Sequence, residues 1–210
     1  MKLLAISNPK FFPDEAEIIN SLFREGLVCL HIRKPESEED DFRNLLSNIK
    51  PEFRDRISIH QYHKLAGEFG IKRLHFPEKE RKLASQESLE KLLSDDFLLS
   101  TSIHDLSEIS NLSEHFSYTF FGPVFNSISK SGYQGVLSHD FFIEPDIKKI
   151  PMIGLGGVNI QNLQQIGKMN FDGAAVLGTL WEKPENAISN FRKLREMVNF
   201  INMKCKNYHE

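Results

Sequence analysis

Eight short apolar segments alternate with helix-like segments along this chain, and no linker rich in Pro, Gly or Ser divides the series. The expected strands cover residues 3–7, 27–33, 57–61, 73–76, 97–103 and 118–124, and two more lie within 151–159 and 172–179. Eight strands that alternate with helices form a parallel sheet, and closure into a single (β/α)8 TIM barrel is the economical arrangement. An open doubly wound sheet is the alternative.

The connecting helices are expected where apolar residues recur at helical spacing. The first begins near residue 13 and ends at Gly26, the second follows the acidic run 36–41, and the last spans 186–203. Shorter helices are expected over 65–70, 85–94, 106–112 and 160–169. The 210 residues fit one domain, 1–210, with a C-terminal tail at about 204–210.

Composition excludes several classes of protein. The formal net charge of −3 argues against a general nucleic-acid or membrane-surface partner. There is no apolar run of transmembrane length, and the N-terminus lacks the pattern of a signal peptide. The two cysteines, Cys29 and Cys205, provide no disulfide framework and are typical of a reduced, cytoplasmic compartment.

Two glycine-bearing strand ends near the C-terminus indicate a phosphate site. The first carries Gly156 and Gly157, and the second carries Leu177 and Gly178. Glycine lets the backbone approach a ligand closely, and free amide N–H groups at a helix start favour an anion. The loops after strands 7 and 8 are where (β/α)8 barrels commonly bind phosphate. We therefore expect a small phosphorylated substrate.

Histidines lie at the ends of four successive strands, at positions 31, 60, 75 and 104. Strand alternation places His31 with Arg33 on one face of a strand, and Ser102 with His104 on one face of another. A single strand histidine is usually a hydrogen-bonded core residue, but four at one rim favour a catalytic or ligand role for at least one. A transition metal is the other use of clustered imidazoles. The spacing matches no local zinc signature, and we expect no metal.

A polar loop after the sixth strand offers further ligands. Ser127, Ser129 and Lys130 suit a phosphate or a carboxylate, because the hydroxyls donate hydrogen bonds and the ammonium is a point charge. The alternative interpretation is a solvated surface loop.

Six segments in order carry a family resemblance: HIRK (31–34), LH (74–75), STSIH (100–104), GPVFNSISK (122–130), GLGGVN (154–159) and GAAVLGT (173–179). Together they resemble thiamine-phosphate synthase and its sister, the TenI-type thiazole tautomerase, over residues 3–200. The resemblance implies a (β/α)8 barrel that acts on a small phosphorylated heterocycle.

The resemblance also implies roles for individual residues. The backbone of Gly156, Gly157, Leu177 and Gly178 would hold a thiazole phosphate, assisted by the loop after the sixth strand. Arg33 matches an arginine that faces the pyrimidine diphosphate in the synthase. His75 matches a family histidine, and His104, two residues after Ser102, matches the acid–base histidine of the tautomerase.

Departures from the family pattern favour the tautomerase. The synthase needs Mg²⁺ held by aspartates after strands 3 and 4, where this chain has Gln61, and Glu78 or Glu80. His31 also replaces a glutamine of the synthase. We expect a tautomerase without a cofactor, in which His104 transfers protons, His31 or His75 is the alternative or helper, and Gln61 contacts substrate.

Two alternatives stay open. One is a divergent synthase in which Glu80 and substrate phosphates hold Mg²⁺, and the other is a non-catalytic binder of thiazole or thiamine phosphate. The sequence allows a homo-oligomer.

Overall fold

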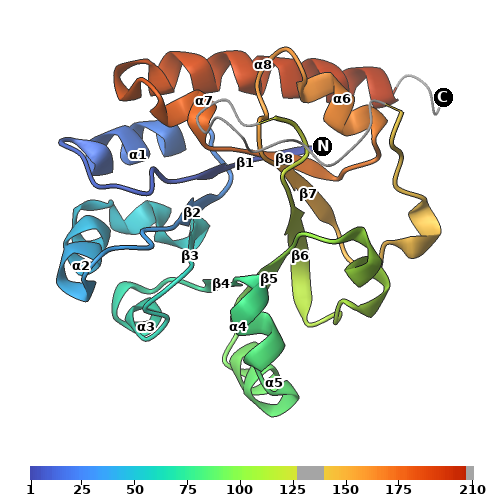
Figure 1. The fold of residues 1–210 in the computed structure, drawn as a ribbon. Helices are drawn as coiled ribbons and strands as arrows, with labels where there is room; N and C mark the ends of the chain where they lie inside the picture. Colours follow the sequence, from blue (N-terminus) through green and yellow to red (C-terminus); the bar gives the residue numbers. More distant parts are fainter. Residues whose placement is uncertain (127–139, 207–210) are drawn as a thin grey trace.

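Eight parallel strands close into a barrel in the computed structural model, which describes residues 1–126 and 140–206. The strands follow one another around the barrel in chain order, and the last pairs with the first (Figure 1). The expected single (β/α)8 barrel is confirmed, and the open doubly wound sheet is wrong. The strands are β1 (Lys2–Ile6), β2 (Leu30–Ile32), β3 (Ile57–Ile59), β4 (Arg73–Phe76), β5 (Leu98–Ile103), β6 (Phe116–Phe121), β7 (Met152–Leu155) and β8 (Gly173–Val176).

Helices surround the barrel (Figure 1). The α-helices are α1 (Glu15–Arg24), α2 (Glu39–Asn48), α3 (Leu65–Phe69), α4 (Glu78–Leu83), α5 (Gln86–Ser94), α6 (Leu163–Lys168), α7 (Gly178–Trp181) and α8 (Ala187–Lys206). The 3-10 helices are η1 (Pro51–Arg56), η2 (Leu106–Asn111), η3 (Pro145–Ile147) and η4 (Pro184–Asn186). Within the expected C-terminal tail, α8 continues as far as Lys206.

Several elements differ from the sequence expectations, among them β6, which covers Phe116–Phe121 where residues 118–124 were expected, and η1, which was not expected. The second strand begins at Leu30 rather than at residue 27, because the amide of Leu27 still donates to Leu22 O at the end of α1. The segment after β5 is a 3-10 helix, in which the Asp105 carboxylate accepts from Ser107 N. The sequence analysis did not predict helix α4, because none of its residues is buried and the helix therefore has no apolar face.

Strand alternation divides the apolar residues into two layers. One face of each strand packs against the surrounding helices, for example through Leu30 and Ile32 of β2. The other face fills the barrel interior. A smaller apolar cluster there comprises Leu4, Ile6, Cys29, Phe120, Ile153 and Ala175. The remainder of the interior is polar and is described with the site below.

The C-terminal part of the chain closes the outer layer. Helix α8 lies across α1, α6 and α7 (Figure 1) and buries Phe191, Leu194 and Val198, as its amphipathic pattern predicts. The Trp181 indole donates to Ile6 O at 2.6 Å, and the N-terminal ammonium donates to Asn202 Oδ1 at 2.7 Å. The N-terminal residue is therefore fastened to α8, and the end of β1 to Trp181.

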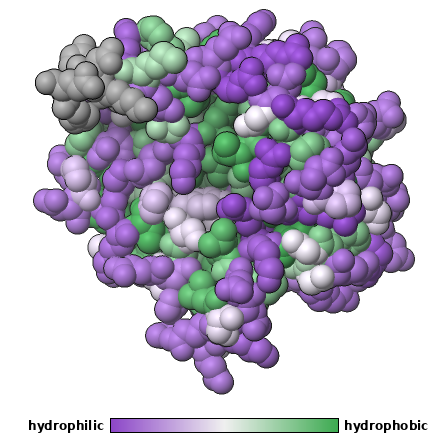
Figure 2. All heavy atoms as spheres, turned by 180° about the vertical axis from the view of Figure 1, so that it is seen from behind, coloured by the Kyte–Doolittle hydropathy of each residue, from purple (hydrophilic) through white to green (hydrophobic). Residues whose placement is uncertain are grey.

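On the face seen in Figure 2, hydrophilic residues form the margin and hydrophobic residues gather towards the middle. Across the described ranges, none of the helices combines the length and apolar character needed to cross a bilayer.

A buried ion pair joins the loop after β2 to the start of α1. Lys34 Nζ donates to both carboxylate oxygens of Glu15, at 2.6 and 2.7 Å, and to Lys10 O at 3.0 Å. The two side chains are 0% and 2% exposed. Burial raises the pKa of Glu15 and lowers that of Lys34, and their mutual hydrogen bond opposes both shifts. Each of the two buried charges is therefore stabilised by the other.

We predict that Glu15→Ala lowers the free energy of unfolding by about 3–5 kcal/mol, because it leaves the Lys34 ammonium buried without its carboxylate. The double variant Glu15→Leu/Lys34→Met should recover most of this loss, because neither charge is then buried. Urea unfolding of the three proteins measures the effect. A loss in the double variant as large as in Glu15→Ala would contradict it.

Candidate functional site

A pocket of about 630 Å³ opens at the carboxyl ends of the strands. Its walls come from the loops after β1, β2, β5, β6, β7 and β8. Polar lining includes Lys10, Arg33, Glu36, Ser102 and His104, and backbone lining includes Gly122, Gly156, Gly157, Leu177 and Gly178. This is the end of a (β/α)8 barrel at which active sites are built.

The two glycine turns meet in this pocket, as the sequence predicts. Gly156 and Gly157 have φ angles of 98° and 64°, the left-handed region that favours glycine. A Cβ at Gly157 would lie 2.2 Å from Asn126 O, so only glycine fits against the loop after β6. Hydrogen bonds between described backbone groups do not use the amide N–H of Gly157 or Gly178. These donors are available to a ligand.

The helices contribute less to this candidate anion site than the sequence analysis expects. Helix α6 begins only at Leu163, several residues after Gly157, and α7 begins at Gly178 but is four residues long. A short helix has a small dipole. The backbone N–H groups themselves are therefore the main feature that suits an anion.

We predict that Gly157→Ala weakens binding of inorganic phosphate by about tenfold or more, because a hydrogen bond to a charged group contributes about 1.5–3 kcal/mol. The new methyl group would displace the turn against Asn126. Gly67→Ala in α3 is the matched control, since a Cβ at that position would meet no neighbouring element within 4 Å. Calorimetric titration with phosphate measures both variants, and equal affinities would contradict the prediction.

Two cations line the wall of the pocket formed by the first two strands. Arg33, directly after β2, is exposed and lines the pocket, and its role in substrate binding stays a prediction. Lys10, in the loop after β1, lies on the same pocket and was not singled out from the sequence. The only sequence feature that could have indicated Lys10 is its position a few residues after the end of a strand. Both side chains suit an anionic substrate.

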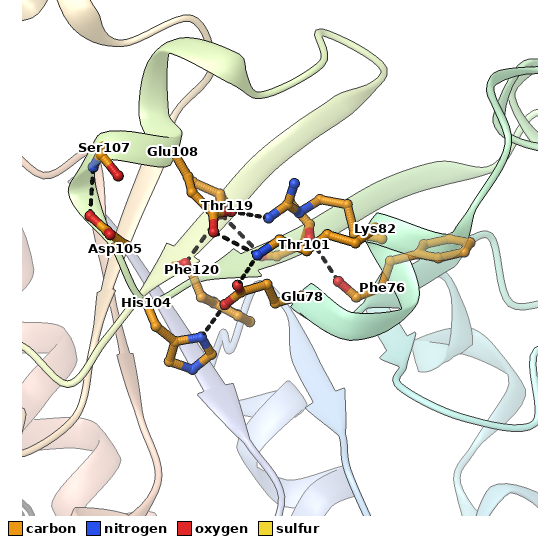
Figure 3. A network of polar contacts seen from close by, with 11 residues as sticks. Phe76, Glu78, Lys82, Thr101, His104, Asp105, Ser107, Glu108, Thr119 and Phe120 are labelled. Carbon is orange, nitrogen blue, oxygen red and sulfur yellow. Dashed lines mark hydrogen bonds and ion pairs between the residues drawn. The ribbon is translucent and has the colours of Figure 1, made fainter.

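His104 is the one predicted catalytic histidine that lines the pocket. It follows β5, and its Nδ1 lies 2.6 Å from Glu78 Oε2 at the start of α4 (Figure 3). Glu78 also forms an ion pair with Lys82. The Lys82 hydrogen bond and then the His104 hydrogen bond lower the pKa of Glu78 to about 2, so the carboxyl is ionised.

The other strand-end histidines lie inside the barrel, below the pocket. His31 and His75 are 0% exposed and His60 is 6% exposed. His31 Nδ1 lies 3.0 Å from His60 Nε2, and His31 Nε2 lies 2.6 Å from the Tyr118 hydroxyl. The expectation that all four histidines meet at one rim is therefore wrong: three form a buried layer beneath it, in which His75 stacks on His60.

His75 approaches the pocket only through a serine. Its Nδ1 and Nε2 each lie 2.9 Å from a hydroxyl, Ser100 Oγ and Ser102 Oγ respectively. Ser102 in turn lines the pocket. An imidazole in this place orients the serine hydroxyl at the pocket floor. His31 has no such link among the hydrogen bonds of the described residues.

The buried histidine layer does not suit a metal ion in its present arrangement. One ring nitrogen of each of His31, His60 and His75 lies within 4.8 Å of the others. The rings of His60 and His75 are stacked, with centroids 3.9 Å apart and an interplanar angle of 23°. Ligating lone pairs lie in the ring planes, so those of stacked rings run side by side and do not converge on one ion.

Burial keeps the layer uncharged. Desolvation lowers the pKa of His31 to about 3 and lowers those of His60 and His75 well below the usual value. Neighbouring positive charge, including that of Arg73 near His31, acts in the same direction. The floor under the pocket is therefore polar and neutral.

We predict that His31 makes the protein less stable as the pH falls. Below a pH of about 6.5 the unfolded chain protonates this histidine, whereas the folded chain keeps it neutral down to about 3. Between about pH 7 and pH 5, His31 should account for about 2 kcal/mol of lost unfolding free energy. His31→Gln should therefore lose less stability over that interval in urea unfolding. An equal loss in both proteins would contradict the assignment.

Gln61 is occupied within the protein. Its amide donates to Lys34 O and to Ser37 Oγ, and its oxygen accepts from Lys34 N. It is not among the residues that line the pocket. The role of Gln61 in substrate binding stays a prediction. In the structure, its side chain fastens the loop after β2.

The positions at which the resemblance implies Mg²⁺ do not fit that ion. Gln61 offers an amide already bonded to backbone, and the Glu78 carboxylate is paired with His104 and Lys82. Glu80 is an exposed side chain whose pKa is raised by partial burial. Mg²⁺ favours one or two free carboxylates, which these residues do not supply together. Ser127, Ser129 and Lys130 lie outside the described residues.

Fold, pocket and glycine turns define a barrel protein suited to a small anionic ligand. A family model described as thiamine monophosphate synthase, TMP-TENI, matches residues 3–180, and the chain belongs to this family.

Named relatives agree with this assignment. A solved structure titled thiamine phosphate pyrophosphorylase, from Bacteroides thetaiotaomicron, is 30% identical, with a TM-score of 0.74 over 95% of this chain and 98% of that one. The thiamine-phosphate synthase of Hydrogenobaculum sp. is 26% identical over 107 residues, 50% of each chain. That of Syntrophomonas wolfei is 24% identical over 188 residues, 86% of this chain and 87% of the relative. The match spans about half the length of the first curated relatives.

Proposed function

We propose that the protein is an enzyme of thiamine biosynthesis that binds a thiazole phosphate and isomerises it by proton transfer, as a TenI-type tautomerase. The observation that carries the proposal is the convergence of the two glycine turns with His104 in one pocket. The amides of Gly157 and Gly178 suit the phosphate, and an imidazole suits proton transfer near neutral pH. Small phosphorylated heterocycles are the substrates of this family, and a cytoplasmic location belongs to the same proposal.

In this proposal each group of pocket residues has the role that suits its chemistry. The backbone amides hold the phosphate, and Arg33 and Lys10 attract a second anionic group such as a ring carboxylate. Ser102, oriented by His75, donates or accepts a hydrogen bond at the floor. His104 takes a proton from one carbon of the substrate and returns a proton to another, so the composition of the substrate does not change.

Thiamine-phosphate synthase is the second candidate. The names of the relatives favour it, including that of the Bacteroides structure at 30% identity. The two cations on the pocket wall would also suit a diphosphate. Against it, Gln61 and Glu78 are committed to other partners, so a divalent cation would need other ligands. A binder without catalysis is the third possibility.

Two assays separate these candidates. Thiazole phosphate with pyrimidine diphosphate should release no pyrophosphate if the proposal holds, whereas the exocyclic thiazole carboxylate tautomer should become aromatic, followed by NMR. Pyrophosphate release would establish the synthase. Tight phosphate binding with neither reaction would establish the binder.

We predict that His104→Ala lowers the rate of aromatisation by about 10²–10⁴-fold, the usual contribution of a general acid–base. Phosphate affinity should be unchanged, because the glycine turns are intact. His115→Ala is the matched control, since His115 contacts Glu90 and does not line the pocket. An His104→Ala variant with normal turnover would exclude His104 as the acid–base.

A further inference from the structure

The pairing of His104 with Glu78 brings together two residues from neighbouring strand ends. His104 follows β5 and Glu78 follows β4, and these strands pair in parallel with His75 opposite Ser100. Adjacent parallel strands therefore deliver the imidazole and the carboxylate to the same side of the pocket. The histidine side chain is 66% exposed and the carboxylate 24% exposed, so the ring depends on this contact for its orientation.

A network of charges holds the carboxylate in place (Figure 3). Glu78 Oε1 accepts from Lys82, one turn along α4, while Oε2 faces His104. Lys82 also donates to Glu108 Oε1 at 2.8 Å, and Arg81 pairs with the other oxygen of Glu108. Each oxygen of Glu78 thus has its own donor, and the group cannot turn without losing one of them.

The direction of the hydrogen bond follows from the charge state. An ionised carboxylate only accepts, so Nδ1 of His104 must carry the proton that it donates to Glu78. In a neutral imidazole the other nitrogen then has a free lone pair. Within residues 1–126 and 140–206, Nε2 of His104 has no hydrogen-bond partner. Nε2 is therefore available to a ligand in the pocket that His104 lines.

We propose that Glu78 is a positioning residue that fixes His104 as the Nδ1–H tautomer and so presents Nε2 to the ligand as a base. The carboxylate that follows β4 thus serves the imidazole and does not hold a divalent cation. The inference deepens the proposed function, on which it rests for the use of His104 as the acid–base.

The ring nitrogens of His104 test the proposal without any substrate. Long-range ¹H–¹⁵N NMR of the whole protein, at a pH at which His104 is neutral, distinguishes the two tautomers. The wild-type protein should show the Nδ1–H form, and Glu78→Ala should shift the ring towards the Nε2–H form. Glu80→Ala is the matched control, because Glu80 is an exposed glutamate of the same helix without a hydrogen bond to His104.

Turnover provides the second readout. Glu78→Ala should lower kcat for aromatisation about tenfold or more and leave KM within about twofold, since binding depends on the glycine turns. Unchanged ring nitrogens in Glu78→Ala would overturn the inference. A shifted tautomer in a protein without tautomerase activity would support the pairing while refuting the proposed reaction, so the two failures are distinguishable.

Discussion

The hydrogen-bonded pairing of β1 with β8 is the interaction on which the rest of the structure depends. It joins Lys2 through Ala5 to Gly173 through Val176 and turns a sheet into a closed barrel. Close approach is possible because Gly173 has no side chain: a Cβ there would lie 2.8 Å from Lys2 O. Since all strands are parallel, closure brings every carboxyl end to one rim. The glycine turns and His104, distant in sequence, meet for this reason.

The sequence alone was sufficient to predict the features that depend on a local pattern of residues. Strand–helix alternation predicted the barrel, and glycine after apolar residues predicted turns that share a pocket. How deep a side chain lies within the barrel was not predictable. Period-two alternation shows on which face of its strand His31 lies, but its position along the barrel axis depends on the pairing of Leu30 with Ile57. Helix α4 was missed because it has no apolar face, and its ion pairs involve Glu108, which lies beyond β5.

The barrel interior is divided between two kinds of packing. Leu4, Ile6 and Ile153 fill one side with apolar atoms, whereas β2 to β5 contribute imidazoles and hydroxyls that satisfy one another. Among the described side chains of this polar side, Ser58 Oγ has no hydrogen-bond partner. Neutral histidines bring no positive charge to the floor of the pocket. In the proposed function, selection for an anion therefore depends on backbone amides and on cations at the rim.

The Lys34–Glu15 pair has a consequence for recognition. Both loops that it joins continue into the pocket wall, one through Lys10 and the other through Arg33. Loops tied by a desolvated pair lose little freedom when a ligand arrives, so the entropic cost of ordering the cationic wall is met during folding. The wall is thus preorganised, and the contact that stabilises the fold would also reduce the entropic cost of binding the anionic substrate that we propose.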